Sequence, residues 1–143
     1  MNCTIKTFDE LTTKELYEIL RSRAEVFVKE QKISYVDTDG VDYKSWHVFA
    51  MDNDRVCAYL RAFKDSEDTI KIGRVLTLVH GKGTGTQLMK YAISELKAKT
   101  GCRKIIMDAQ SHAISFYQRL GFTITSEEYL EEGIPHVDME MNL

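Results

Sequence analysis

Residues Val75–Thr86 read VLTLVHGKGTGT, and this stretch decides the fold. Apolar and β-branched residues end abruptly in three glycines at alternate positions, from Gly81 to Gly85. The residues that follow, Gln87–Leu96, have the spacing of an amphipathic helix. Glycine permits φ > 0 and close approach of the backbone, and free N–H groups at a helix N-terminus point toward an anion. The stretch therefore predicts a phosphate-binding loop, with Lys82 at its rim.

Two common nucleotide motifs do not fit the spacing of these glycines. A P-loop has its lysine after the last glycine and before Ser or Thr, whereas Lys82 lies between glycines. A dinucleotide fingerprint, G-x-G-x-x-G, would need a glycine at Thr86 or Leu88. The pattern from His80 to Gly85 resembles the (Gln/Arg)-x-x-Gly-x-(Gly/Ala) loop of the GNAT superfamily of N-acetyltransferases, which holds the pyrophosphate of acetyl-CoA. His80 stands where Gln or Arg is usual in that loop.

The composition indicates one soluble globular domain, residues 1–143, large enough to bury a core. Hydrophobic residues make up 43% and charged residues 29%. The net charge of −3 gives no support for a nucleic-acid or membrane partner, and no apolar run approaches the ~20 residues of a membrane span. Cys3, Cys57 and Cys102 are scattered, so we expect neither disulfides nor a metal site, and a cytoplasmic location fits.

Hydrophobic periodicity and turn residues predict the remaining elements. These are strands at Cys3–Phe8, Trp46–Met51, Arg55–Lys64, Thr69–Val79 and Lys104–Ala109, a helix capped by Thr12 or Thr13, a helix from the glycine loop to about Thr100, and a final strand after Gly133-Ile134-Pro135. Short polar connections imply antiparallel hairpins, whereas the strand, helix and strand around the glycine loop imply a parallel crossover. The predicted fold class is a mixed α/β sheet, mostly antiparallel with one parallel pair, and flanking helices.

Two arginines lie on otherwise apolar faces of these predicted elements. Arg23 shares the apolar stripe of the first helix, where it can pair with a carboxylate or point into a cleft. Arg74 alternates in step with the apolar residues of its strand, which would place it on their face of the sheet. A β-bulge at Gly73 would turn its side chain to the other face. If both arginines face the cleft, they would bind an anionic group on a substrate.

A second motif follows at Gln110–Phe122, QSHAISFYQRLGF. GNAT proteins carry Asn-x-x-Ala-x-x-(Leu/Phe)-Tyr-x-x-x-Gly-Phe, and this chain matches it at Ala113, Phe116, Tyr117, Gly121 and Phe122, with Gln110 in place of Asn. Together with VFVKEQ at Val26–Gln31 and GIPHV at Gly133–Val137, the two motifs resemble the ElaA-like branch of the GNAT superfamily over nearly the whole chain.

This resemblance implies the GNAT acyl-CoA N-acyltransferase fold, with its parallel pair of strands splayed apart. It implies direct transfer of an acetyl group from acetyl-CoA to a primary amine of a small molecule or peptide, in a ternary complex. Acetyl-CoA is expected to contact Leu76, Thr77, Leu78, His80, Gly81, Lys82, Gly83, Thr84, Gly85, Thr86, Gln110 and Phe116. A GNAT-like domain that binds CoA without catalysis is the alternative, and assembly into a homodimer is left open.

Direct transfer needs a base, an oxyanion donor and an acid, because a lysine-like amine has a pKa of ~10.4 and must lose its proton. The donor is expected among the backbone N–H groups of Leu76–Leu78, and the family implies Tyr117 as the acid. Many GNAT proteins have a glutamate base in the strand before the loop, but Thr69–Val79 contains no acidic residue. Histidine titrates near ~6.5, so His136 is predicted as the base, with His47 as its competitor. Arg23, Arg74 and His47 complete the expected substrate-binding set.

Overall fold

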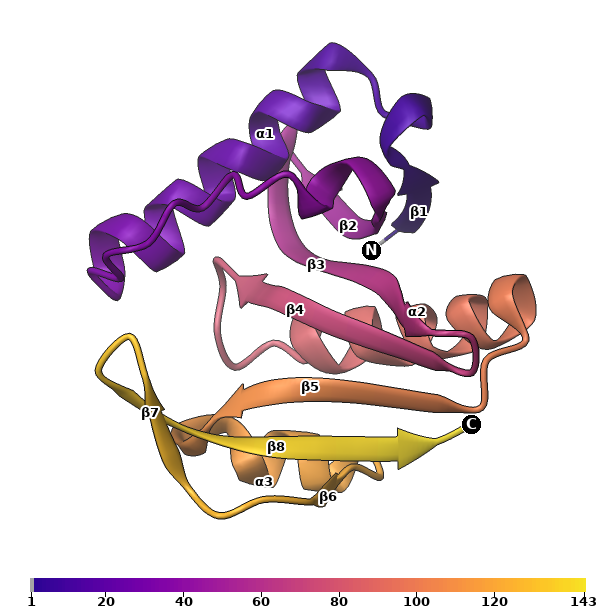
Figure 1. Cartoon of the computed structure of the whole chain (residues 1–143). Helices are drawn as coiled ribbons and strands as arrows, with labels where there is room; N and C mark the ends of the chain where they lie inside the picture. Colours follow the sequence, from indigo (N-terminus) through magenta and orange to yellow (C-terminus); the bar gives the residue numbers. More distant parts are fainter. Residues whose placement is uncertain (1) are drawn as a thin grey trace.

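The computed structural model describes residues 2–143, and their strands form one sheet (Figure 1). The strands are β1 (Cys3–Thr7), β2 (Trp46–Asp52), β3 (Arg55–Ser66), β4 (Thr69–Thr77), β5 (Lys104–Gln110), β6 (Thr123–Ile124), β7 (Tyr129–Glu131) and β8 (Ile134–Asn142). They lie in the order β1-β2-β3-β4-β5-β8-β6, and β7 pairs with β8. Strands β4 and β5 are parallel and the other described pairs are antiparallel, which confirms the predicted fold class.

The start of α1 and the end of α2 lie at residues that the sequence marks as caps. α1 (Thr13–Arg23) is capped by Thr12 and runs into a π-helical turn, η2 (Ala24–Glu30). α2 (Thr84–Thr100) follows the glycine loop and ends at Gly101 in the left-handed conformation. α3 (Ile114–Arg119) and the single 3₁₀ turns η1 (Phe8–Glu10), η3 (Val41–Lys44) and η4 (Ser111–Ala113) are shorter. None of the helices within residues 2–143 has both the length and the apolar character needed to cross a membrane.

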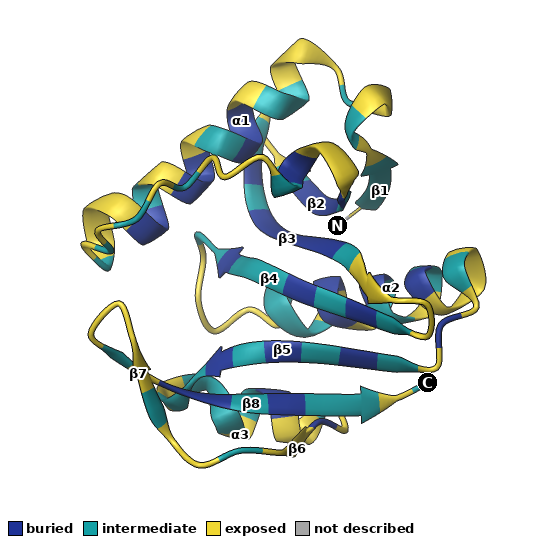
Figure 2. Cartoon of the chain, in the orientation of Figure 1, coloured by how far each residue is buried: buried dark blue, intermediate teal, exposed yellow. Residues whose placement is uncertain are grey.

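Helices cover both faces of the sheet and divide the core in two (Figure 2). On one face, Leu88 and Leu96 of α2 pack in the same cluster as Ile70 and Ile72 of β4. On the other face, α1 and η2 pack against strands β2, β3 and β4, in a cluster that includes Ile19. Burial of this apolar surface is the main stabilising contribution to the fold.

A β-bulge in β4 reverses which face of the sheet its side chains point to, so that even-numbered residues before and after the bulge lie on opposite faces. Ile72 belongs to the core against α2, whereas Leu76 belongs to the core against α1. The pairing with β3 shifts between Gly73 and Leu76, so β4 has one residue more than its partner there. The bulge was predicted at Gly73, but the residue with φ of 51° is its neighbour Arg74. The bulge is therefore confirmed, and its position is corrected by one residue.

Strands β4 and β5 diverge from the same point. Their parallel pairing runs from Thr69 opposite Lys104 to Ile72 opposite Met107. Beyond Met107, β5 continues beside β8, while β4 continues beside β3 (Figure 1). The bulge and the separation together leave the C-terminal end of β4 without a neighbour on the β5 side.

Residues 31–45, which connect η2 to β2 and which we call the aspartate loop, are tied to α1 by a buried arginine. The Arg23 side chain is fully buried, and its guanidinium donates to the carboxylates of Asp37 (2.9 Å) and Asp42 (2.7 Å). His47 is also buried, with Nδ1 2.7 Å from the Tyr59 hydroxyl and Nε2 2.9 Å from the Asp42 carbonyl. Since a carbonyl oxygen only accepts hydrogen bonds, Nε2 carries the proton and Nδ1 accepts from Tyr59.

Two further arginines hold the same loop from the sheet. Arg61 on β3 donates to the Asp39 carboxylate at 2.7 and 2.8 Å. Arg74 on β4 donates to Asp37 at 3.0 Å, and its guanidinium carbon lies 4.3 Å from the centroid of the Tyr35 ring. Three arginines from α1, β3 and β4 thus fix one loop against the sheet.

This network shifts the acid–base equilibria of its members. Hydrogen bonds from Arg61 hold the pKa of Asp39 well below its usual range. Burial alone would raise the pKa of Asp42, but hydrogen bonds from Arg23 and Arg61 outweigh it and lower that pKa. Burial lowers the pKa of His47.

We expect the free energy of unfolding to fall in two stages on acidification. The pKa of His47 is lower in the folded chain than in the unfolded chain, so the unfolded chain takes up this proton first and stability falls below about pH 6.5. The pKa values of Asp39 and Asp42 are also lowered, so their contribution is present above about pH 3.9 and is lost below it. Urea unfolding across this pH range measures both stages. The variant His47→Gln should lack the first stage, and a first stage of the same size in variant and parent would contradict this assignment.

Candidate active site

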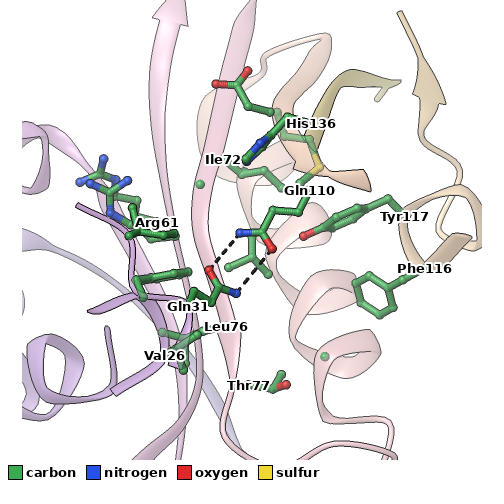
Figure 3. A pocket seen from close by; sticks show the side chains of 18 of the residues that line it. Val26, Gln31, Arg61, Ile72, Leu76, Thr77, Gln110, Phe116, Tyr117 and His136 are labelled. Carbon is green, nitrogen blue, oxygen red and sulfur yellow. Dashed lines mark hydrogen bonds between the residues drawn. The ribbon is translucent and has the colours of Figure 1, made fainter. Parts of the chain in front are cut away.

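A cavity of about 990 Å³ opens where β4 and β5 diverge (Figure 3). Its walls come from the glycine loop and the start of α2, from η2 and the aspartate loop, from β5 and α3, and from the turn between β7 and β8. The predicted site residues that line it are Arg74, Leu76, Thr77, His80, Gly81, Gly83, Thr84, Gly85, Thr86, Gln110, Phe116, Tyr117 and His136. Leu78, Lys82, Arg23 and His47 are not among its lining residues.

The glycine loop ends in an open helix N-terminus. Gly83 is the N-cap of α2 with φ of 73°, and its carbonyl accepts the first helical hydrogen bond, from the N–H of Gln87 at 3.0 Å. The N–H groups of residues 84–86 precede that bond and have no partner within the helix. A Cβ atom on Gly81 or Gly83 would meet no protein atom within 4 Å. The backbone around Gly81 and Gly83 is therefore open to an approaching ligand, and residues 84–86 line the cavity with N–H groups that can bind an anion.

Gly85 has a different role from the other two glycines. A Cβ atom there would lie 3.3 Å from Cζ of Phe116 and 3.5 Å from Cγ2 of Thr77. The absence of a side chain at Gly85 therefore lets α3 and β4 pack closely against the start of α2. This contact fixes the aromatic wall of the cavity relative to the anion site.

One backbone N–H of β4 faces the gap between the strands. The N–H of Leu78 donates to the Cys57 carbonyl on β3 at 2.8 Å, so it is not free. Successive N–H groups point to opposite sides of a strand, so the N–H of Thr77 points away from β3. Of the three backbone N–H groups expected as oxyanion donors, those of Leu76–Leu78, only the N–H of Thr77 therefore points into the gap.

Tyr117 presents its hydroxyl to the cavity (Figure 3). The residue is 6% exposed, and its ring packs edge-on between Phe116 and Phe122. No hydrogen-bond partner for this hydroxyl occurs among residues 2–143. Burial raises the pKa of Tyr117, so the hydroxyl keeps its proton at neutral pH and can donate it.

His136 lines the cavity from β8 with one ring nitrogen held by the backbone. Nδ1 lies 2.7 Å from the carbonyl oxygen of Ile134, so Nδ1 carries the proton of the neutral ring. The lone pair is then on Nε2, which lies 3.4 Å from the carboxylate of Glu131. The ring also stacks on Tyr129, with centroids 6.1 Å apart. In this arrangement Nε2 is the ring nitrogen that can exchange a proton with a bound group, and the Glu131 carboxylate lies beside it.

Two residues expected at the substrate site lie elsewhere. The guanidinium of Arg23 is enclosed by Asp37 and Asp42, and both ring nitrogens of His47 are hydrogen-bonded. Neither side chain lines the cavity, so their expected substrate-binding role is corrected to a structural one: they hold the aspartate loop.

A pair of glutamine amides crosses the cavity (Figure 3). Gln110 at the end of β5 donates to Gln31 at 3.0 Å, and Gln31 donates back at 3.5 Å. Nε2 of His112 lies 2.6 Å from the Gln110 side-chain oxygen. Gln31 was not among the predicted site residues, although it belongs to the VFVKEQ run, because local periodicity does not reveal a contact with a residue 79 positions away. Five carboxylate residues that line the cavity were also not predicted: Glu30, Asp39, Asp108, Glu131 and Glu132.

Comparison with known sequences gives the family. A model of the acetyltransferase (GNAT) domain matches residues 8–143. A UPF0039 protein of Schizosaccharomyces pombe is 37% identical over 142 residues, which cover 96% of this chain and 95% of that protein. The ElaA protein of Escherichia coli is 36% identical over 136 residues, which cover 91% of this chain and 89% of that protein.

Solved structures agree with this relationship. The crystal structure of an acyl-CoA N-acyltransferase from Pseudomonas aeruginosa matches with a TM-score of 0.91 and 37% identity, covering 98% of each chain. The crystal structure of Escherichia coli ElaA matches with a TM-score of 0.91 and 33% identity, also over 98% of each chain. An aminoglycoside 6'-N-acetyltransferase complexed with coenzyme A, 16% identical, shares the fold with a TM-score of 0.76 over 97% of this chain and 96% of that one. The chain described here belongs to the GNAT acetyltransferase family, and its similar relatives include ElaA and UPF0039 proteins.

Proposed function

We propose that this protein transfers an acetyl group from acetyl-CoA to a primary amine. The observation that carries the proposal is one cavity that joins the open N-terminus of α2, the hydroxyl of Tyr117 and the Nε2 atom of His136. An anion site, a proton donor and a proton acceptor are the groups that this transfer requires. Membership of the GNAT family supports the same reaction.

The residues of the cavity fit acetyl-CoA. The free N–H groups of residues 84–86 would bind the pyrophosphate, with Lys82 exposed at the rim of the loop. The gap between β4 and β5 would take the extended pantetheine arm, because the N–H of Thr77 has no strand partner on that side. Acetyl-CoA supplies an acetyl thioester, which an unprotonated amine can attack.

Each proton in the transfer has a residue to move it. His136 takes the proton of the ammonium group at Nε2 and releases it to solvent, and after the neutral amine has attacked the thioester it takes the second proton from the nitrogen and releases that to solvent as well. The Glu131 carboxylate 3.4 Å away stabilises the imidazolium formed at each stage. The N–H of Thr77 donates to the carbonyl oxygen while the new C–N bond forms. Tyr117 donates its hydroxyl proton to the sulfur as the C–S bond breaks, and it then regains a proton from solvent. The products are the acetamide and free CoA.

The first prediction concerns the glycine loop. Gly83→Val should weaken CoA binding by at least about tenfold, because the side chain fills the space that the phosphates approach. Isothermal titration calorimetry measures the affinity. Gly101→Val at the other end of α2 is the matched control, since Gly101 also has a positive φ and no neighbour within 4 Å of an added Cβ. Equal CoA affinity in the two variants would contradict the loop assignment.

The second prediction separates catalysis from binding at Tyr117. Tyr117→Phe keeps the packed ring and removes the proton donor, so turnover should fall by about 10²–10⁴-fold with little change in acetyl-CoA affinity. Thiol release measures turnover, and Tyr91→Phe on α2 is a control for the loss of a hydroxyl. If the chemical step is rate-limiting and Tyr117→Phe still turns over at the rate of the parent, Tyr117 is not the acid and serves only in packing. A parent protein that binds CoA but acetylates no amine would instead favour a CoA-binding domain without catalysis.

The third prediction concerns the base. Asparagine at position 136 cannot accept a proton, so His136→Asn should lose turnover together with the acidic limb of the pH profile of kcat/KM. His47→Asn should lose stability but keep that limb, because His47 lies outside the cavity with both ring nitrogens bonded. Loss of the limb in His47→Asn alone would show that the assignment of the base is wrong.

A further inference from the structure

The two glutamines whose amides cross the cavity belong to opposite sides of the gap between β4 and β5. Gln31 is the C-terminal cap of η2, which packs in one cluster with Leu76 of β4. Gln110 is the last residue of β5, three positions beyond Met107, where the pairing with β4 ends. Figure 3 shows the two side chains pointing toward one another across the cavity. This contact, which we call the amide bridge, therefore spans the gap in which the pantetheine arm would lie.

The amide bridge has a direction, because one of its two hydrogen bonds is shorter than the other. The side-chain N–H of Gln110 donates to the Gln31 side-chain oxygen at 3.0 Å, whereas the return bond from Gln31 is 3.5 Å long. The Gln110 oxygen has a closer partner in Nε2 of His112, at 2.6 Å. An amide oxygen only accepts hydrogen bonds, so Nε2 of His112 carries the proton and fixes the orientation of the Gln110 amide. The donor of Gln110 thus faces the gap, where the Gln31 oxygen accepts from it.

The Gln31 oxygen has the chemistry of a group that CoA would bring to the same place. The pantetheine arm contains secondary amides, and the carboxamide of Gln31 presents the same kind of carbonyl acceptor. A carbonyl oxygen of the arm and the Gln31 oxygen would therefore compete for one donor, the side-chain N–H of Gln110. Both glutamines are partly exposed, so water can hydrogen-bond to whichever amide is released.

The Gln31 side chain can leave the amide bridge without a change in the backbone. The backbone N–H of Gln31 donates to the Val26 carbonyl at 3.0 Å, and that of Ile33 donates to the Phe27 carbonyl at 2.9 Å. These bonds hold the end of η2 and the first residues of the aspartate loop. The Gln31 side chain is long and has many rotamers, so rotation about its own bonds is enough to release Gln110.

On these grounds we propose that Gln31 is an internal competitor for the pantetheine arm and lowers the affinity of the protein for CoA. In the free protein the Gln31 oxygen occupies the donor of Gln110. When CoA or acetyl-CoA binds, a carbonyl oxygen of the arm takes over this donor, and the Gln31 side chain rotates out of the gap. His112 keeps the Gln110 amide in the same orientation in both states. The inference rests on the CoA binding proposed above and does not depend on catalysis.

Removing the competitor should strengthen CoA binding. Methionine keeps the length and flexibility of glutamine but has no amide, so Gln31→Met should bind CoA about two- to tenfold more tightly than the parent, measured by isothermal titration calorimetry. In a Gln110→Met background the same change should have no effect, because the donor for which the two oxygens compete is gone. Gln118→Met is the matched control, since Gln118 is exposed and does not line the cavity.

The results that would overturn the proposal differ from those that would contradict the proposed function. Unchanged or weaker CoA binding in Gln31→Met would show that the amide bridge only stabilises the fold or persists in the complex. The same gain in both backgrounds would assign the effect to the methionine side chain and would also overturn the proposal. In each of these cases the parent still binds CoA, so the proposed function stands. A parent protein that binds no CoA would overturn both.

A stronger competitor at the same position should have the opposite effect. A carboxylate accepts from the Gln110 donor in a charge-assisted hydrogen bond, so Gln31→Glu should tighten the contact across the gap. Pantetheine is the probe, because it has no phosphate for the new charge to repel. Its affinity, measured by NMR titration, should be about threefold or more below that of the parent in Gln31→Glu and above it in Gln31→Met. Pantetheine binding to Gln31→Glu that equals or exceeds binding to Gln31→Met would overturn the proposal.

The side-chain amide signals of the ¹⁵N-labelled protein report the exchange of partners directly. Gln31→Met and Gln110→Met assign the two signals by their loss. At saturating CoA, the Gln31 signal should move toward the position of the exposed Gln118, and the Gln110 signal should remain distinct from it. A Gln31 side-chain signal that does not move at saturating CoA would overturn the proposal, because the amide bridge would then be intact in the complex.

Discussion

The positive φ of Arg74 is the constraint on which the site depends. A non-glycine residue in this conformation costs about 1–2 kcal/mol, and here it lies where β4 gains a residue and β5 turns away. The ion pairs of Arg74 with the aspartate loop and its stacking on Tyr35 oppose that cost. The same local distortion therefore opens the gap between β4 and β5 and holds the aspartate loop against the sheet.

Two anchoring systems meet at this gap. On the CoA side, Gly85 lets Phe116 reach the start of α2, so that the anion site and the aromatic wall are one packed unit. On the acceptor side, Arg23 and Arg61 hold the aspartate loop through buried ion pairs. Removing one residue of such a pair would leave a buried charge unpaired, which is strongly destabilising. The ion pairs therefore hold the loop in one position even where their net contribution to stability is small. The Gln31–Gln110 amide pair connects the two sides across the cavity.

Local sequence patterns were sufficient for most of the fold. Period-two and helical spacing predicted α1, α2 and the strands β1 to β5 and β8 to within a few residues, but not the short strands β6 and β7 or the π-helical turn η2. The glycine loop and the motif after β5 predicted the family. Long-range contacts were not predictable in this way. The burial of Arg23 depends on aspartates 14 and 19 residues further along, and the contact of Gln31 with Gln110 depends on the folded sheet. Strand parity favoured His136 over His47 as the base, but the hydrogen bonds that enclose His47 and the place of His136 in the cavity wall were visible only in the structure.

We propose that CoA occupies the gap between β4 and β5 and the N-terminus of α2. The most direct measurement is a titration of the ¹⁵N-labelled protein with CoA, followed residue by residue through backbone amide chemical shifts. The account predicts that the largest shifts fall on Thr77, on Gly81–Thr86 and on Gln110, while amides of β1 and of Gly101 remain unchanged. Saturable shifts confined to another surface, or no shift at Thr77 and residues 84–86 at saturating CoA, would contradict it.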